Sequence, residues 1–164
     1  MKSQLLFEFT VDKGNNEIHV KREFAASRKK VWAAWTQSEL LDQWWAPKPW
    51  KAKTKSLDFR EGGAWIYSMV GPDGSEHWAR ADYKTINPQN DFTWLDGFSD
   101  ENGKLNEALP QAHWSINFED KQEETMVAID IKFETLEDLN QIIEMGFKEG
   151  FTSGLENLDE LLAS

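Results

Sequence analysis

The side chains with the widest chemical range in this sequence are three histidines, His19, His77 and His113. A histidine metal site needs further ligands at matched positions. None of the three has a second histidine or a carboxylate at a helical metal-binding spacing. We therefore interpret them as strand or surface residues, and the sequence predicts no metal site.

Two further motifs resemble catalytic or phosphate-binding signatures but fail on spacing. In the run Gly150-Phe151-Thr152-Ser153-Gly154 the serine stands one place late for a nucleophile elbow, and the run lies in a helical pattern rather than after a strand. Gly62-Gly63 lacks the glycine spacing and the following lysine of a phosphate loop. The chain has no cysteine, which excludes disulfides, thiolate metal sites and cysteine nucleophiles. We expect no cofactor and assign no catalytic residue.

The aromatic residues are the compositional outlier, with nine Trp and ten Phe in 164 residues. Tryptophan often lines ligand cavities or interfaces, because its large apolar ring also carries an N–H donor. The residues that we predict to line a cavity come from several strands and from the C-terminal helix. They are Trp65, Tyr67, Trp78, Arg80, Trp94, Trp114, Phe147 and Phe151. Plain core packing is the alternative for the aromatic members of this set.

The orientation of one candidate strand stays open at this point. Trp78, Arg80 and Asp82 share one strand face, and Ala79, Ala81 and Tyr83 share the other. If the first face points inward, Arg80 and Asp82 form a charge pair beside an aromatic wall, and burial requires that they be paired. If it points outward, they are ordinary surface residues.

The element that must position these residues is the C-terminal stretch from Leu136 to Leu162. Its apolar residues recur at three- and four-residue steps, which predicts one long helix, and Thr135 before Glu137 and Asp138 is a typical helix start. Each glycine inside a helix costs about 1 kcal/mol relative to alanine. The three at positions 146, 150 and 154 therefore predict close approach to the sheet, and we expect Gly150→Leu to overpack it.

The preceding chain has the pattern of short strands separated by turns. We expect a hairpin from residues 5–11 and 17–24, then two short helices, one after Ser27 and one from Ser38 to Trp45. Further strands are predicted at residues 52–59, 64–70, 76–86, 92–98, 113–118 and 126–133. This order predicts an α+β domain over residues 1–164, in which a curved antiparallel sheet surrounds the long helix.

The charge balance limits the partners. A net charge of −11 argues against nucleic acid and against anionic membranes, because both are bound through Lys and Arg. No apolar run reaches the length that spans a membrane, and the first residues lack a signal-peptide pattern. We expect a cytoplasmic protein.

Several stretches together resemble the START-like helix-grip superfamily, also called SRPBCC. They are Arg22-Glu23-Phe24, Val31-Trp32-Ala33-Ala34-Trp35-Thr36, Trp44-Trp45-Ala46-Pro47, Asp58-Phe59-Arg60-Glu61-Gly62-Gly63, Phe92-Thr93-Trp94 and Met145-Gly146-Phe147 through Gly150-Phe151. Within it, the chain is similar to the branch named for activators of the heat-shock-protein-90 ATPase. The resemblance implies six or seven antiparallel strands around a C-terminal helix, a hydrophobic cavity and, for the co-chaperone members, a stress-response setting.

The resemblance leaves three functions open. We expect binding of a small hydrophobic or aromatic molecule in the cavity. The first alternative is a protein-interaction module similar to the C-terminal domain of the co-chaperone, which an exposed apolar patch outside the cavity would favour. The second is a cyclase- or hydrolase-like enzyme, which an inward-facing carboxylate with no neutralising partner would favour.

Overall fold

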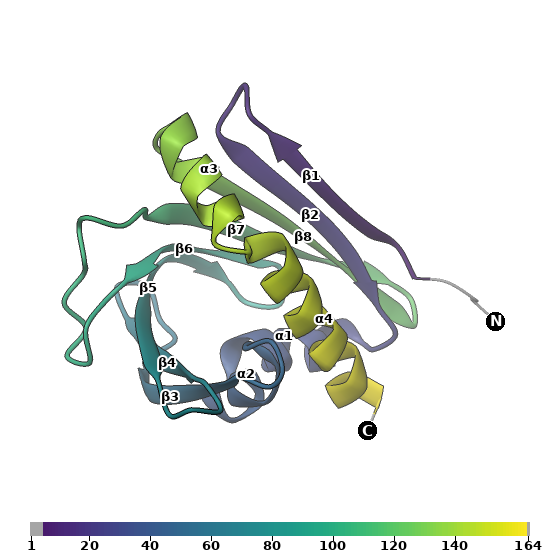
Figure 1. Cartoon of the computed structure of the whole chain (residues 1–164). Coiled ribbons are helices and arrows are strands. Elements are labelled where there is room, and N and C mark those ends of the chain that lie inside the picture. Colours follow the sequence, from purple (N-terminus) through teal and green to yellow (C-terminus); the bar gives the residue numbers. More distant parts are fainter. Residues whose placement is uncertain (1–4, 164) are drawn as a thin grey trace.

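The polypeptide forms one open antiparallel sheet of eight strands that curves around the C-terminal helices (Figure 1). The computed structural model describes residues 5–163. The strands lie in the order β1-β2-β8-β7-β6-β5-β4-β3. They are β1 (Phe7–Asp12), β2 (Glu17–Phe24), β3 (Lys51–Leu57), β4 (Ala64–Val70), β5 (Glu76–Asn87), β6 (Asp91–Phe98), β7 (Ala112–Lys121) and β8 (Glu124–Phe133).

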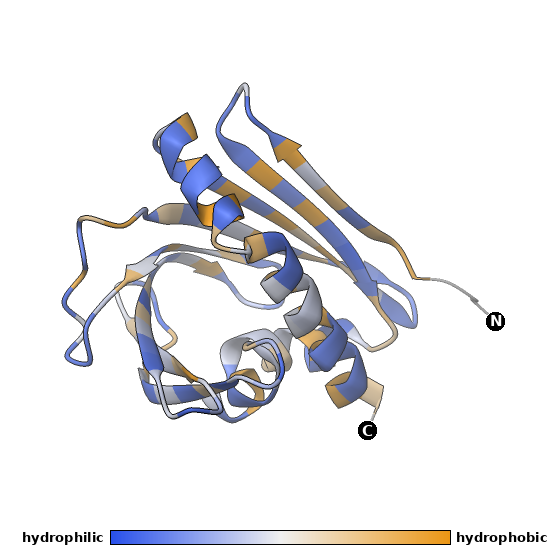
Figure 2. Ribbon diagram, viewed as in Figure 1, coloured by the Kyte–Doolittle hydropathy of each residue, from blue (hydrophilic) through white to orange (hydrophobic). Residues whose placement is uncertain are grey.

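The strands predicted from alternation are all present, and the sheet has eight strands rather than the six or seven that the resemblance implied. Strand β2 pairs with β8 as well as β1, so the first hairpin lies beside the last strand of the chain. Figure 2 shows hydrophobic and hydrophilic residues alternating along β1 and β2. Alternating side chains point to opposite faces, so one face of the sheet supplies the core.

The two short helices, α1 (Arg28–Thr36) and α2 (Ser38–Trp44), connect β2 to β3. The Ser27 side chain caps α1 by accepting a hydrogen bond from the backbone N–H of Lys30. Gln37 has extended backbone angles, so the chain turns there and α2 begins. The indole N–H of Trp44 donates to the carbonyl of Ala34 at 2.9 Å and fixes α2 against α1.

The prediction of one continuous C-terminal helix is wrong. The chain forms α3 (Leu136–Glu144) and α4 (Phe147–Ala163), although Thr135 caps the first of them as expected. Gly146 separates the two with a φ of 90°, a left-handed conformation that L side chains rarely adopt and that typically ends helices. No helix within residues 5–163 is long and apolar enough to cross a membrane.

Helix α4 packs on the C-terminal end of α2. A Cβ added at Gly154 would lie 3.2 Å from the carbonyl oxygens of Trp44 and Trp45, so the absence of a side chain permits this approach. The buried side chain of Asn157 donates to the carbonyl of Ala46 at 2.9 Å. It thereby satisfies a backbone acceptor that the end of α2 leaves without a helical partner.

The three helix glycines thus have different roles, and the expectation that all three pack against the sheet is wrong. Gly146 ends a helix, and Gly154 contacts α2. A Cβ at Gly150 would meet only Pro47, at an ordinary contact distance of 3.8 Å. Overpacking is therefore expected at Gly154 and not at Gly150.

Matched alanine substitutions test this assignment. Gly150→Ala is expected to raise the free energy of unfolding by about 0.5–1 kcal/mol, because alanine is the better helix former and has room. Gly154→Ala is expected to lower it by about 1 kcal/mol, because its Cβ presses on backbone carbonyls that have little freedom to move. Urea unfolding of both variants measures the difference. Equal stabilisation by both substitutions would contradict the close contact between α4 and α2.

Candidate functional site

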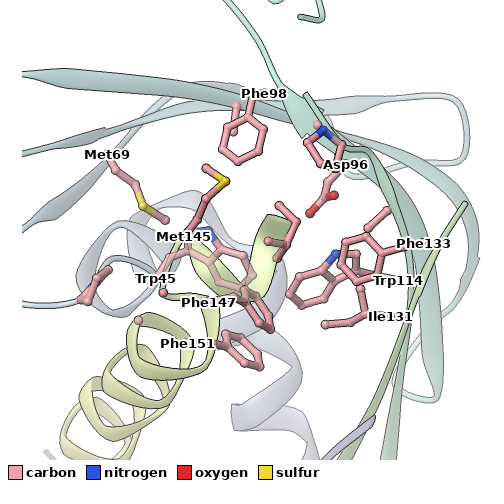
Figure 3. Close-up of a pocket in the computed structure, with 18 of the residues that line it drawn as sticks. Trp45, Met69, Asp96, Phe98, Trp114, Ile131, Phe133, Met145, Phe147 and Phe151 are labelled. Carbon is pink, nitrogen blue, oxygen red and sulfur yellow. The ribbon is translucent and has the colours of Figure 1, made fainter. Parts of the chain in front are cut away.

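A pocket of about 320 Å³ lies between the sheet and the α3–α4 junction (Figure 3). The strands contribute mainly Tyr67, Met69, Asp96, Trp114, Ile131 and Phe133. The helices and the turn after α2 contribute mainly Trp45, Pro47, Met145, Phe147, Gly150 and Phe151.

The position of the pocket follows from the length of the helices that fill the concave side of the sheet. Trp32 of α1 packs against Phe59, Phe92 and Phe118 with ring centroids 5.0–5.8 Å apart, so this end of the interior is filled. Helix α2 ends near Trp45, whose ring lies 5.9 Å from that of Trp114. Beyond Trp45 the sheet continues, and the space under α3 and the start of α4 is left open as the pocket.

Aromatic rings in fixed contact form one wall. Phe147 and Phe151 lie one helical turn apart on α4 and stack at 5.2 Å with an interplanar angle of 15°. Trp114 meets Phe151 edge-on at 5.5 Å and 90°. These ring contacts hold the side chains of the wall against one another.

Four of the eight residues predicted to line a cavity border this pocket: Tyr67, Trp114, Phe147 and Phe151. Trp65 and Trp94 lie on the inner face as well, but they are fully buried in the adjoining core. Trp65 stacks on Tyr67 at 4.1 Å, and Trp94 lies 5.4 Å from Trp114, so both support the wall from behind.

Trp78 and Arg80 do not line the pocket, and their inclusion in the predicted lining was wrong. They alternate along β5 with Ala79, which does border the pocket, so they point to the opposite face of the sheet. There Arg80 forms an ion pair with Asp82 at 2.7 Å and donates to the carbonyl of Gly103 at 2.8 Å. The charge pair that the sequence left open is therefore on the outer side.

Asp96 is the functional candidate that sequence reasoning missed. Figure 3 shows its carboxylate among the aromatic side chains of the pocket, beside Trp114. Burial raises the pKa of Asp96 from 3.8 to about 7, opposed by hydrogen bonding from the backbone N–H of Ala112 and by the indoles of Trp114 and Trp94. Within residues 5–163 the indole N–H of Trp94 has no partner in good hydrogen-bond geometry, and Trp94 lowers the pKa of Asp96 least of the three groups.

The sequence did contain a signal for Asp96. It lies two residues after Trp94 on β6, and side chains two apart share a strand face. Since Trp94 is predicted to line the cavity, the same periodicity predicts that Asp96 faces inward too.

The second polar group of the pocket is the Tyr67 hydroxyl. It accepts a hydrogen bond from the indole N–H of Trp45 at 2.9 Å. Burial raises the pKa of Tyr67 further above its ordinary value, so the hydroxyl stays neutral and keeps its proton near neutral pH.

A cluster of possible metal ligands lies on the first hairpin, formed by β1 and β2, and its residues do not line the pocket. Atoms of Asp12, Glu17 and His19 lie within 4.8 Å of one another. The two ring nitrogens of His19 already lie 3.1 Å from a Glu17 oxygen and 2.6 Å from an Asp130 oxygen. The Asp12 carboxylate accepts hydrogen bonds from the backbone and side chain of Asn15. Contacts within the protein therefore engage His19 and Asp12.

Comparison with known proteins gives matches over nearly the whole chain. A family model described as Activator of Hsp90 ATPase homolog 1-like protein matches residues 25–163. A search of curated proteins finds no match.

Solved structures from several bacteria share the fold and part of the sequence. A solution structure of a protein from Arthrobacter aurescens is 31% identical, with a TM-score of 0.90 over 95% of this chain and 91% of that one. Protein Ms6760 from Mycobacterium smegmatis is 27% identical, with a TM-score of 0.88 and 97% coverage of both chains. A protein from Staphylococcus epidermidis is 29% identical, with a TM-score of 0.82 over 94% of this chain and 93% of that one.

Proposed function

The chain belongs to the family of Activator of Hsp90 ATPase homolog 1-like proteins, and we propose that it binds a small hydrophobic or aromatic molecule in the pocket under the α3–α4 junction. The observation that carries this proposal is the aromatic lining of a 320 Å³ pocket that contains few polar groups. Sites for small molecules are typically concave, mostly apolar and largely formed before binding.

The distribution of exposed apolar residues favours the pocket over an outer surface as the binding site. Among the described residues, the large apolar side chains that are exposed are Phe7, Val11, Leu136 and Met145. The first two lie on β1 and the others near the two ends of α3, and Met145 itself borders the pocket. A protein-interaction module would need a larger continuous apolar surface.

A second candidate function, proton-transfer catalysis in the same pocket, is favoured by Asp96. A carboxyl with a pKa of about 7 suits the uptake or release of a proton near neutral pH. Turnover that is lost in Asp96→Asn, with binding of neutral molecules intact, would identify this function.

Binding of the neutral fluorescent probe N-phenyl-1-naphthylamine tests the proposed function. We expect saturable binding to the native protein and a dissociation constant raised about tenfold or more in Gly150→Leu. The leucine side chain would extend from the pocket lining beside Pro47 into the space that the probe occupies. Fluorescence titration of the probe measures both constants.

Trp78→Ala is the matched control, because it removes an aromatic ring from the outer face of the sheet. Its dissociation constant is expected to stay within about twofold of the native value. Unchanged binding in Gly150→Leu would mean that the probe binds elsewhere, and absence of binding to the native protein would refute the proposed function.

A further inference from the structure

Among the residues between 5 and 163 that line the pocket, Asp96 is the one with a formally charged side chain. Its immediate partners are N–H donors, the backbone of Ala112 and the indole of Trp114, and these carry no net charge. Within residues 5–163, no lysine, arginine or histidine lies within ion-pair distance of it in the structure. An ionised carboxylate in an apolar site is costly unless a positive charge neutralises it.

The aromatic rings that line the pocket together with Asp96 are suited to a positive charge. The faces of Trp, Tyr and Phe attract cations, and cages of such rings are a recurrent means of binding ammonium groups. Trp45, Tyr67, Trp114, Phe147 and Phe151 all border the pocket. The net charge of −11 adds a long-range attraction for cations in general.

We propose that the pocket selects a small organic cation, an amine joined to an aromatic or aliphatic body, with the Asp96 carboxylate as its counter-ion and the aromatic rings as its walls. This inference rests on the proposed binding function and names the class of ligand. A neutral ligand would leave the carboxylate without a counter-charge and would gain only hydrogen bonds to it. An anionic ligand would meet like charge at short range.

A matched pair of probes tests the inference. 1-Naphthalenemethylamine and 1-naphthalenemethanol share one ring system and differ only in a protonated amine against a neutral hydroxyl. At about pH 8, where both the amine and Asp96 carry their charges, we expect the amine to bind at least about tenfold more tightly. Isothermal titration calorimetry measures both affinities.

Two variants with the same change in net charge distinguish the effect of the pocket carboxylate from the long-range attraction exerted by the net charge of the protein. Asp96→Asn is expected to abolish the preference for the amine, with the affinity for the alcohol changed less than about threefold. Asp82→Asn removes a carboxylate from the outer face of the sheet, where it pairs with Arg80, and is expected to retain the preference. A preference that survives in Asp96→Asn would overturn the inference.

A measurement on the native protein does not depend on the folding of any variant. Lowering the pH from about 8 to about 5 protonates Asp96, so the preference for the amine should shrink while the affinity for the alcohol changes little. The other titratable group among the pocket-lining residues is the Tyr67 hydroxyl, which stays neutral over this range.

The outcomes distinguish the inference from the proposed function. Equal binding of both probes in the native protein would overturn the selection of cations and leave the binding function intact. Binding of neither probe would overturn both. Tighter binding of 1-naphthoic acid than of the amine would also overturn the inference, because a carboxylate ligand would be repelled by Asp96.

Discussion

Replacing Trp45 with alanine is expected to lower the free energy of unfolding by about 3–5 kcal/mol, the usual cost of truncating a large buried aromatic residue. Trp45 is the central ring of the aromatic core. It contacts Trp65, Trp94 and Trp114 of the sheet with ring centroids 5.4–5.9 Å apart, and Phe151 of α4 at 6.1 Å. Its removal would join the pocket to the core, and urea unfolding measures the loss.

Two controls give the physical origin of that loss. Trp45→Phe keeps a ring but removes the hydrogen bond to the Tyr67 hydroxyl, so we expect a cost of about 1–2 kcal/mol. Trp78→Ala removes a half-buried indole from the outer face, where the Lys55 ammonium lies over its ring, and a loss of about 1 kcal/mol or less is expected. A loss in Trp45→Ala no greater than in Trp78→Ala would show that Trp45 is not central to the core.

The contribution of Asp96 to the free energy of unfolding is expected to decrease as the pH rises from about 4 to about 7. Burial raises the pKa of this carboxyl to about 7 in the folded protein, whereas the unfolded chain has the ordinary value of 3.8. Between these values the folded protein keeps a proton that the unfolded chain has released, so each increase in pH favours unfolding. The stabilisation is complete below about pH 4 and is lost by about pH 7.

The magnitude follows from the size of the shift and the exposure of the group. A shift of about three pKa units corresponds to about 4 kcal/mol. Asp96 is only partly buried and faces a pocket that admits water, so we expect about 1–3 kcal/mol. Urea unfolding at several pH values, for the native protein and for Asp96→Asn, isolates this contribution from the other acids. If the free energies of unfolding of the two proteins changed with pH in parallel, the raised pKa of Asp96 in the folded protein would be contradicted.

The sheet could be predicted from the sequence because its strands alternate cleanly. In β8, Val127, Ile129 and Ile131 share the buried face. The helix break could not be predicted in the same way, since a glycine within an apolar helical pattern is compatible with either an interior position or a helix end. Only the backbone angle of Gly146, which three-dimensional packing determines, distinguishes it from Gly150 and Gly154.

Only part of the candidate site was predicted, because its aromatic residues follow the usual pattern of inward-facing side chains and its charged residue does not. Tyr67, Trp114, Phe147 and Phe151 are large aromatics on inward faces, and both properties are visible in the sequence. Trp65 shares a face with Tyr67 but is fully buried, with the ring of Trp45 5.4 Å away, and strand alternation alone does not predict such a contact. Asp96 was missed because a charged residue in a strand is ordinarily assigned to the solvent face.

The open sheet leaves two edge strands, and they differ in how readily a second chain could add to them. On β3 the exposed side chains are Lys51, Lys53, Lys55 and Ser56. The backbone N–H of Thr54 at this edge donates to the Asp42 side chain of α2 at 3.0 Å. Lysines and covered backbone groups oppose strand addition. Strand β1, at the other end of the strand order, exposes Phe7 and Val11 as well as Glu8 and Thr10, and none of them is a lysine. Self-association through backbone pairing, where it occurs, is therefore directed to β1, on the opposite edge of the sheet from the lysine-rich strand.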